Sequence, residues 1–366
     1  MQQPINLMHI ISGDIWGGAE AQAFDLLRML VENTNWNIRV IVFNSSLLSE
    51  KLRHHGIETV LIDEKTTPPY TMIKEIRKQI KQHNINIIHT HGYKENILGN
   101  ISNLFISKTK SIRTAHGNPE FRTSWKAPQK IIFKYLDLII GKLLQQKIIA
   151  VSSQLEELLS RSYKNKVVKI HNSIRPVIKQ PTPLATKIVI GIAGRLVRVK
   201  RVDIFIDMVN HLSRNEHMPQ FEAWIIGDGP LRHELESQAK RLQVDSLVNF
   251  TGFINPVIPK LQKLDLLIMC SDHEGLPITL LEALSLGVPI IAHRTGGIPE
   301  VLCNGEAGVL ISEHTPTSYS KAVIDLVSDP VEMKKLSYKS KKHFNNKFNL
   351  DITYRYYVDL YENLTQ

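Results

Sequence analysis

The stretch SDHEGLPITLLEAL, residues 271–284, holds two glutamates, Glu274 and Glu282, among residues of little other polarity. The apolar run LDLLIMCS that leads into it is typical of a buried strand, and DHEG is typical of a loop. Pro277 suits the first turn of a helix, and Gly287 suits the position just beyond its end. We therefore predict that Glu274 lies in a loop at the carboxyl end of a strand and Glu282 in the second turn of a helix. Such a pair either accepts hydrogen bonds from a ligand, for example from sugar hydroxyl groups, or caps and pairs locally.

The same alternation of strand and helix extends through both halves of the chain. Residues 5–12 predict a buried strand and residues 17–32 a helix, with further strand candidates after them. These candidates are IRVIVF, IETVLI, INIIHT, SIRTAH, KIIAVS and KVVKIHN in the first half, and IVIGIAG, FEAWIIG, LVNFTG, LDLLIMCS, VPIIAHRT and AGVLIS in the second. Residues 173–187 contain three prolines and predict a linker, whereas 330–366 predict helix alone. The sequence therefore predicts an α/β protein with two doubly wound parallel sheets and with ligand at the carboxyl ends of the strands.

Positive charge is concentrated in the first half. The chain of 366 residues has 45 Lys and Arg against 35 Asp and Glu, and residues 1–176 hold 24 of the bases and 14 of the acids. A basic half predicts an anionic partner such as a membrane surface, a lipid phosphate or a nucleic acid. No nucleic acid is expected, because the basic residues lack interleaved aromatic side chains and no binding motif is present.

Residues 122–147 combine basic and apolar side chains. Bases at every fourth position stand beside aromatic residues and many Leu and Ile; they are Arg122, Lys126, Lys130 and Lys134, with Trp125 and Phe133. This pattern is typical of an interfacial helix whose lysines contact anionic lipid. The alternative is a helix that covers the sheet and has a solvated lysine face, and Pro128 interrupts the run.

The cysteines and the N-terminus indicate a compartment. Cys270 and Cys303 are the only cysteines, and neither lies in a Cys-x-x-Cys motif. The opening MQQPINLMHIISG has no basic region ahead of an apolar one. We therefore expect a cytoplasmic protein without a signal peptide. No apolar run approaches the length of a membrane span, so membrane contact would be peripheral, on the inner face of the cell membrane.

Two further loops after predicted strands carry groups suited to phosphate. Arg195 and Lys200 follow IVIGIAG, where two cations can neutralise a nucleotide diphosphate; the alternative is solvated surface charge. Gly17 and Gly18 open a helix, where free amides and the helix dipole favour an anion, or form a plain turn. The glycine spacing of SGDIWGG does not make G-x-G-x-x-G, and RVIVF is followed by Asn44 instead of an acid. This argues against a dinucleotide-binding dehydrogenase.

Three histidines lie near the ends of predicted strands. His116 in TAHGN could donate a hydrogen bond to a sugar hydroxyl or to charge at a reacting centre, and the alternative is a structural role. His89 and His91 in IIHTHG could line an acceptor site. His-x-His also invites a zinc hypothesis, but no third ligand is spaced nearby in the sequence, so no metal is expected.

These motifs, in this order, resemble those of retaining glycosyltransferases of family four, which have the GT-B fold. SDHEGLPITLLEAL resembles the E-x7-E signature of the family, and four other stretches resemble its loops: SGDIWGGAE, GIAGRLVRVKRVD, IIGDGPLRHELE and TGGIPEVL. The resemblance covers nearly the whole chain. It implies two Rossmann-like domains that face a deep cleft, an acceptor-side domain at 1–176 and a nucleotide-sugar domain at 177–345. It also implies a C-terminal helix, 346–366, that packs back on the first domain.

The resemblance implies roles in donor binding. Arg195 and Lys200 match the pair that holds the donor phosphates and stabilises the leaving group. Glu282 matches the glutamate that binds the ribose hydroxyls, and Glu274 the one that contacts the donor sugar. No cofactor or metal is implied, because the cations can replace a metal and the nucleotide sugar is a substrate.

The resemblance also implies roles for backbone groups and for one histidine. The amides around Gly296, Gly297 and Ile298 are similar to those that line the donor site of the family. The loop of Gly17 and Gly18 matches the one used against the donor phosphate and sugar. His116 matches a histidine near the donor sugar.

We therefore expect a retaining, metal-independent hexosyltransferase. It would move a sugar from a nucleotide-diphosphate sugar, with a UDP-sugar favoured over a GDP-sugar, to a lipid-linked or saccharide acceptor in lipopolysaccharide or polysaccharide synthesis. The acceptor hydroxyl would attack the face from which the phosphate leaves. The alternatives are a GT-B epimerase or phosphorylase, and a non-catalytic protein that binds a nucleotide sugar or a membrane surface.

Overall fold

The chain divides into two compact units. The computed structural model describes residues 4–14, 16–106, 108–116, 128–180 and 187–366, without the side chains of 128–132. Unit 1 comprises Met1–Arg175 and Leu350–Gln366, and unit 2 comprises Pro176–Asn349. The division thus falls one residue before the sequence-based boundary at 176, and the returning segment begins at Leu350 where the sequence suggested 346.

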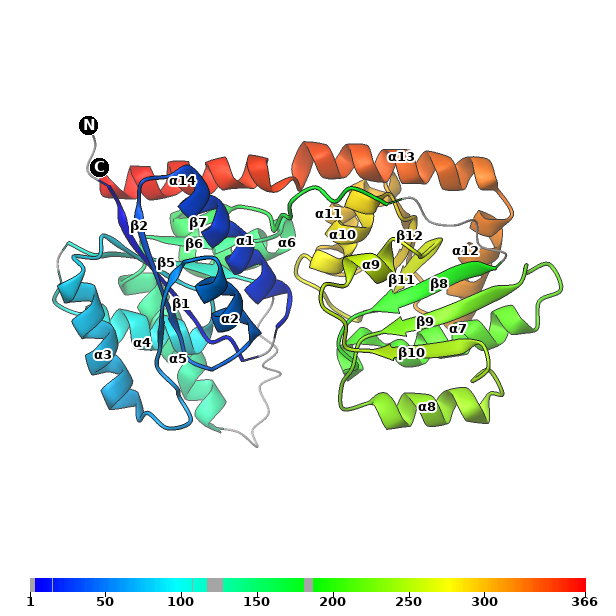
Figure 1. Cartoon of the computed structure of the whole chain (residues 1–366), viewed down its shortest axis with the longest axis horizontal. Helices are drawn as coiled ribbons and strands as arrows, with labels where there is room; N and C mark the ends of the chain where they lie inside the picture. Colours follow the sequence, from blue (N-terminus) through cyan, green and yellow to red (C-terminus); the bar gives the residue numbers. More distant parts are fainter. Residues whose placement is uncertain (1–3, 15, 107, 117–127, 181–186) are drawn as a thin grey trace. The chain divides into compact units, whose positions relative to one another are not determined.

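Unit 1 is built on a seven-stranded sheet in the order β3-β2-β1-β4-β5-β6-β7. In Figure 1 its strands are the blue to green arrows. Neighbouring strands all run parallel, so that Leu7 of β1 lies opposite Ile38 on one side and Ile87 on the other. The strands are β1 (Asn6–Ile11), β2 (Asn37–Val42), β3 (Glu58–Leu61), β4 (Ile87–Thr90), β5 (Lys110–Ala115), β6 (Lys147–Ala150) and β7 (Val167–Lys169).

Helices join the parallel strands of unit 1 and cover both faces of its sheet. They are α1 (Gly18–Asn33), α2 (Leu47–His54), α3 (Pro69–Gln82), α4 (Tyr93–Asn103), α5 (Pro128–Leu143), α6 (Ser153–Tyr163), the 3-10 turn η1 (Lys164–Lys166) and the returning α14 (Leu350–Thr365). Side chains alternate along each strand. In β1, Leu7 and Ile11 pack with α1, α2 and α14, whereas Met8 and Ile10 pack with α3 and α4.

Helix α14 completes the core of unit 1. Its first amide, that of Leu350, donates to the carbonyl of Ile174 at 3.0 Å. Tyr357 and Tyr361, both buried, belong to the same apolar cluster as α1 and β1. The end of the chain therefore contributes large aromatic side chains to the core of the unit that the N-terminus begins.

Unit 2 repeats the design on a six-stranded parallel sheet in the order β10-β9-β8-β11-β12-β13. Its strands are β8 (Ile188–Ala193), β9 (Phe221–Ile226), β10 (Val248–Gly252), β11 (Leu266–Met269), β12 (Ile290–His293) and β13 (Val309–Ile311). The helices and 3-10 turns are η2 (Arg198–Lys200), α7 (Val202–Ser213), α8 (Arg232–Arg241), α9 (Ile258–Leu261), α10 (Ile278–Leu286), α11 (Ile298–Val301), η3 (Cys303–Gly305), α12 (Pro316–Val327) and α13 (Pro330–Lys347). A separate apolar core joins β8, β9 and β11 to α7, α8 and α12.

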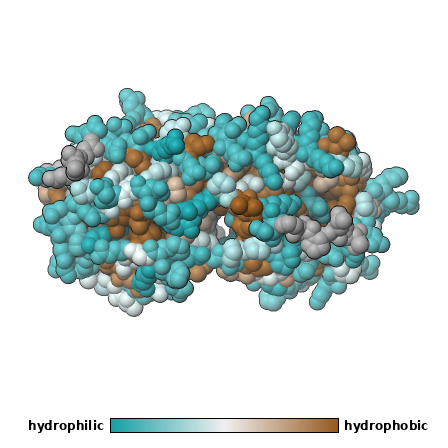
Figure 2. All heavy atoms as spheres, turned by 45° about the horizontal axis from the view of Figure 1, so that its top comes forward, coloured by the Kyte–Doolittle hydropathy of each residue, from teal (hydrophilic) through white to brown (hydrophobic). Residues whose placement is uncertain are grey.

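The strand predictions are confirmed throughout, because each predicted run overlaps one strand of the structure, with ends that agree within a few residues. The described part of α5 begins at Pro128, and proline is well tolerated in the first turn of a helix. The face shown in Figure 2 is mostly hydrophilic on both units, with small separate hydrophobic areas. Within the described ranges, no helix combines the length and the apolar character needed to cross a membrane.

Candidate functional site

Three loops of unit 2, each at the carboxyl end of a strand, are bonded to one another. They follow β8, β11 and β12. The amide of Asp272 donates to the carbonyl of Val199 at 2.8 Å, and the Thr295 hydroxyl donates to the carbonyl of Asp272 at 2.9 Å. The amide of Gly297 donates to the carbonyl of Glu274 at 3.0 Å. The topology therefore brings residues about a hundred positions apart into one site at the usual ligand edge of such a sheet.

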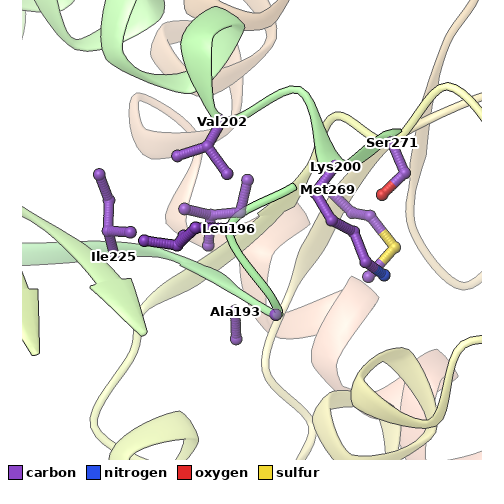
Figure 3. A pocket seen from close by; sticks show the side chains of 9 residues that line it. Ala193, Leu196, Lys200, Val202, Ile225, Met269 and Ser271 are labelled. Carbon is purple, nitrogen blue, oxygen red and sulfur yellow. The ribbon is translucent and has the colours of Figure 1, made fainter. Parts of the chain in front are cut away.

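Lys200 and Glu274 form an ion pair at this edge. The Nζ of Lys200 lies 2.5 Å from Oε1 of Glu274, and Ser271 donates its hydroxyl proton to the same oxygen at 2.6 Å. The two side chains retain 24% and 12% of their exposure, so the pair is largely shielded from water. In Figure 3 the Lys200 side chain extends beside Met269 and Ser271 at the wall of a small pocket. The structure thus places two of the predicted site residues, Lys200 and Glu274, in direct contact.

Glycines allow the loops to approach this closely. Gly296 has φ +56°, and a Cβ there would lie 1.9 Å from the carbonyl oxygen of Glu274. A Cβ at Gly227, in the turn after β9, would lie 1.9 Å from the carbonyl oxygen of Gly194 in the loop after β8. No side chain can be accommodated at such a separation, so both positions require glycine.

The remaining predicted residues of unit 2 lie on the same elements. Glu282 is half-buried in the second turn of α10, which begins after Pro277, ends at Leu286 and is capped by Gly287 with φ +69°. Gly297 precedes α11, and Ile298, its first residue, is buried. The helix prediction for this stretch is therefore confirmed in position and length.

Arg195 lies exposed on the loop after β8, with no ion pair in the part of the chain that the structure describes. A different arginine, Arg201, binds acids beside the site. Its guanidinium contacts Asp203 at 2.8 Å and Asp272 at 3.3 Å. Its hydrogen bonds to Asp203 raise the pKa of Arg201 above its ordinary value. The sequence analysis did not single out Arg201. It is one of four bases in RLVRVKR, residues 195–201, and nothing in that run distinguishes it from the others.

The glycine loop of unit 1 differs from its prediction. Gly18 is the first residue of α1, but the amide of Gly17 is not free: it donates to Oε2 of Glu20 at 3.1 Å. Burial raises the pKa of Glu20, and nearby Glu95 and Asp14 raise it further. A carboxylate already occupies this helix start, so an incoming anion would have to displace Glu20.

Histidines from several strands of unit 1 meet at the carboxyl end of its sheet. His116 follows β5 and His91 follows β4, and their ring nitrogens lie 3.1 Å apart. His89 of β4 and His9 of β1 are buried behind them. Burial lowers the pKa of His116 to about 4 and that of His9 to about 3. It also lowers the pKa of His89 and His91 well below the ordinary value, so all of these rings are neutral near neutral pH.

A third histidine lies next to His89 and His91 in space, although none is spaced near them in the sequence. Ring nitrogens of His9, His89 and His91 all lie within 4.8 Å of one another, which could accommodate a metal ion. His9 comes from a strand far away in the sequence, so spacing could not reveal it. Each of the three rings already makes hydrogen bonds to the others or to Tyr361 and Thr114. Absence of a metal stays a prediction.

Helix α5 carries an apolar exposed face. Residues 122–127 of the predicted interfacial segment, with Arg122 and Lys126, lie outside the described residues, as does the side chain of Lys130. Farther along, Tyr135, Ile139 and Leu143 recur every fourth position and retain 62%, 51% and 73% of their exposure. Lys134 and Lys142 are exposed near them.

Two doubly wound parallel units with polar loops at their carboxyl ends are typical of GT-B proteins, and the comparisons with known proteins agree. The model Glycosyltransferase Family 4 matches residues 16–176, and Glycosyl transferases group 1 matches residues 174–343. Together they span most of both units. The chain belongs to the family-four type of glycosyltransferases and has the GT-B fold.

The similar proteins have related names. The chain is 24% identical to UDP-Gal:alpha-D-GlcNAc-diphosphoundecaprenol alpha-1,3-galactosyltransferase of Escherichia coli, over 94% of this chain and 92% of that one. It is 29% identical to the lipopolysaccharide core biosynthesis glycosyltransferase LpsE of Rhizobium meliloti, over 41% of this chain and 42% of that one. Among solved structures, Anabaena Alr3699/HepE in complex with UDP has a TM-score of 0.85 at 17% identity, over 98% of this chain and 100% of that one. At this identity the structural likeness concerns the fold.

Proposed function

We propose that this glycosyltransferase moves a sugar from a nucleoside-diphosphate sugar, with UDP the favoured nucleotide, to a lipid-linked or saccharide acceptor in polysaccharide or lipopolysaccharide synthesis. The observation that carries the proposal is the shielded pair of Lys200 and Glu274 on bonded loops of unit 2. The UDP of the HepE structure and the UDP-galactose and lipid diphosphate in the name of the E. coli relative support the same donor and acceptor classes.

The pair suits a ligand with a diphosphate next to sugars. A diphosphate would compete with Glu274 for the ammonium group of Lys200, and the freed carboxylate could then accept hydrogen bonds from sugar hydroxyls. Arg195, exposed on the same loop as the start of η2, would add a second cation for the phosphates. Glu282 would accept hydrogen bonds from the ribose hydroxyls.

The proposed reaction retains the configuration of the sugar. The bond between the anomeric carbon and the phosphate oxygen breaks, and a bond from the acceptor oxygen forms on the same face. The departing phosphate oxygen takes the proton of the acceptor hydroxyl. Lys200 and Arg195 stabilise the charge that develops on the phosphate, a kind of stabilisation that often dominates catalysis. The two cations supply this without a metal ion, and no cofactor is needed.

The exposed face of α5 supports a peripheral location on the cytoplasmic side of a membrane. Two attractions hold a helix at an anionic interface: burial of apolar side chains and attraction of lysines to lipid headgroups. The exposed face of α5 offers both, with apolar side chains at Tyr135, Ile139 and Leu143 and lysines at Lys134 and Lys142. A lipid-linked acceptor would be found at such an interface.

A thermal-shift screen with UDP, GDP and ADP and their sugar conjugates tests the donor. A ligand that binds only the folded state raises the midpoint, so UDP compounds should raise it most. Glu282→Ala should abolish both the shift and the turnover, whereas replacing the exposed Glu306 by Ala should change neither. If no nucleoside diphosphate raises the midpoint, the transferase proposal fails. Shifts without any turnover over a range of acceptors would favour a non-catalytic binding protein.

A further inference from the structure

Five side chains of unit 1 form a continuous run of hydrogen bonds that ends at His116. The hydroxyl of Tyr361, on α14, lies 2.6 Å from Nδ1 of His89 and 3.3 Å from Nε2 of His9. Nδ1 of His9 lies 2.9 Å from Nε2 of His91. Nδ1 of His91 lies 3.1 Å from Nε2 of His116. We call Tyr361, His9, His91 and His116 the histidine chain, with His89 as its branch.

A neutral imidazole carries one N–H, so a ring that donates through one nitrogen must accept through the other. Burial keeps the rings of the histidine chain neutral. The hydrogen bonds of the histidine chain can therefore run in only two directions. The direction at Tyr361 fixes the tautomer of His116.

The distances around Tyr361 select one direction. A separation of 2.6 Å is short for an N–H donor but normal for an O–H donor, so the hydroxyl of Tyr361 donates to Nδ1 of His89. His89 then donates from Nε2 to the hydroxyl oxygen of Thr114 at 2.7 Å. Because its single proton is used, the Tyr361 oxygen accepts from Nε2–H of His9 at the longer distance of 3.3 Å.

The tautomer of His116 follows from this direction. His9 accepts at Nδ1 from Nε2–H of His91, and His91 accepts at Nδ1 from Nε2–H of His116. Nδ1 of His116 is then without a proton. This atom is buried and has no hydrogen-bond partner among the residues that the structure describes.

We propose that Tyr361 sets the tautomer of His116 through His9 and His91, so that Nδ1 of His116 is held without a proton, as a hydrogen-bond acceptor. Tyr361 is thus a positioning residue, supplied by the returning helix from a place 272 residues beyond His89. Only the effect on turnover rests on the proposed function. The proposal reverses the sequence-based expectation that His116 donates.

Nitrogen-15 NMR of the full-length protein with labelled histidine tests the tautomer directly. In the wild-type protein we expect His116 to show a single tautomer with its proton on Nε2. Tyr361→Phe removes the hydroxyl with little change of volume, and His116 should then show a mixture of tautomers. Tyr319→Phe is the control, because Tyr319 is also fully buried but lies on α12 of unit 2, outside the histidine chain. It should leave the His116 signals unchanged.

Kinetics give a second readout. Tyr361→Phe should lower kcat about five- to tenfold, as for loss of one hydrogen bond, with the KM of the donor unchanged. A wild-type spectrum with the proton on Nδ1 would overturn the proposal, and this result requires no variant to fold. An unchanged His116 tautomer in folded Tyr361→Phe, or stoichiometric zinc in the purified protein, would also overturn it. The NMR spectra are recorded without a nucleotide sugar. If no nucleotide bound in the thermal-shift screen, the tautomer of His116 could therefore still be determined.

Discussion

Lys200 is the residue on which phosphate binding should depend most. Its ammonium group is shielded and paired with Glu274, so in Lys200→Ala the cation is lost and the acid is left in a poorly solvated place. We expect kcat/KM to fall by roughly 10²- to 10³-fold, the usual effect of removing one group that stabilises developing charge. Steady-state kinetics and UDP calorimetry measure the loss.

Arg198→Ala provides the control for this substitution. Arg198 begins the same 3-10 turn and is exposed, so it stands for the solvated charge of the run RLVRVKR. Its removal should change kcat/KM by less than about twofold, since exposed charges contribute little. Equal losses of kcat/KM in Lys200→Ala and Arg198→Ala would show that the bases of RLVRVKR act only through their summed positive charge.

Gly296 tests how tightly the loops must fit. Gly296→Ala combines a positive φ with a clash against the carbonyl oxygen of Glu274. Gly56→Ala shares the strain, with φ +69°, but has open space around the new methyl group. We expect about 1–2 kcal/mol of destabilisation for Gly56→Ala, and more, with loss of activity, for Gly296→Ala. Urea unfolding measures both, and equal values would contradict the close approach.

Single residues can be predicted from the sequence when they belong to a short motif at a strand end or a helix start. Glu274, Glu282 and Lys200 could be placed because each lies at a fixed offset from a strand end or a helix start. The hydrogen bond of Gly17 to Glu20 could also have been anticipated, since an acid at the third helical position commonly binds the amide before the helix. Tyr361 could not be found, because it meets His9 only through the fold.

At the scale of the element, α5 is the helix whose role is most open to test. Lysines near an anionic surface contribute about 1 kcal/mol each, so Lys134→Glu with Lys142→Glu should weaken binding to phosphatidylserine vesicles by at least about thirtyfold. The same two charge changes at Lys74 and Lys81, exposed on α3, serve as the control. Cosedimentation measures binding. Unchanged binding of the α5 variant, or equal losses in both, would reject α5 as the contact.

Strands were predictable as elements because buried parallel strands are short apolar runs bounded by turn residues. The exposed face of α5 was only partly predictable: the lysine spacing is visible in the sequence, but Asp137 is buried against Arg113 at 2.6 Å. A charged residue within the segment thus faces inward, which hydrophobic periodicity does not anticipate.

At the scale of the whole molecule, the buried histidines make stability depend on pH. Their folded pKa is lowered by burial, to about 3 for His9 and about 4 for His116, and the unfolded chain has the ordinary value of 6.5. Below pH 6.5 the unfolded state therefore binds more protons, and stability present above that pH is lost on acidification. Each such histidine should cost about 2 kcal/mol at pH 5.

Urea unfolding at pH 7.5 and pH 5 checks this expectation. His9→Phe removes one titrating ring, so the stability lost between pH 7.5 and pH 5 should be smaller by about 2 kcal/mol than in the wild-type protein. A free energy of unfolding that stays level across this interval would contradict the burial of neutral histidines. Unit 1 contains the four rings, so its transition should move most.

The two units could be foreseen because the strand alternation stops at the proline-rich linker and then resumes. Return of the chain to unit 1 at Leu350 has no local signal, since α13 and α14 are both amphipathic helices. The boundary between the units at Leu350 depends on which hydrophobic core each helix packs into. Helix α14 packs into the core of unit 1 through residues such as Tyr357.

Hydrogen–deuterium exchange of the whole protein with and without UDP tests the central claim most directly. Binding at the bonded loops of unit 2 predicts slower exchange in residues 194–200, 271–276 and 294–298 when UDP is added. The protection should disappear in Lys200→Ala. Saturating UDP without protection in these three loops, or with protection confined to other segments, would contradict the account.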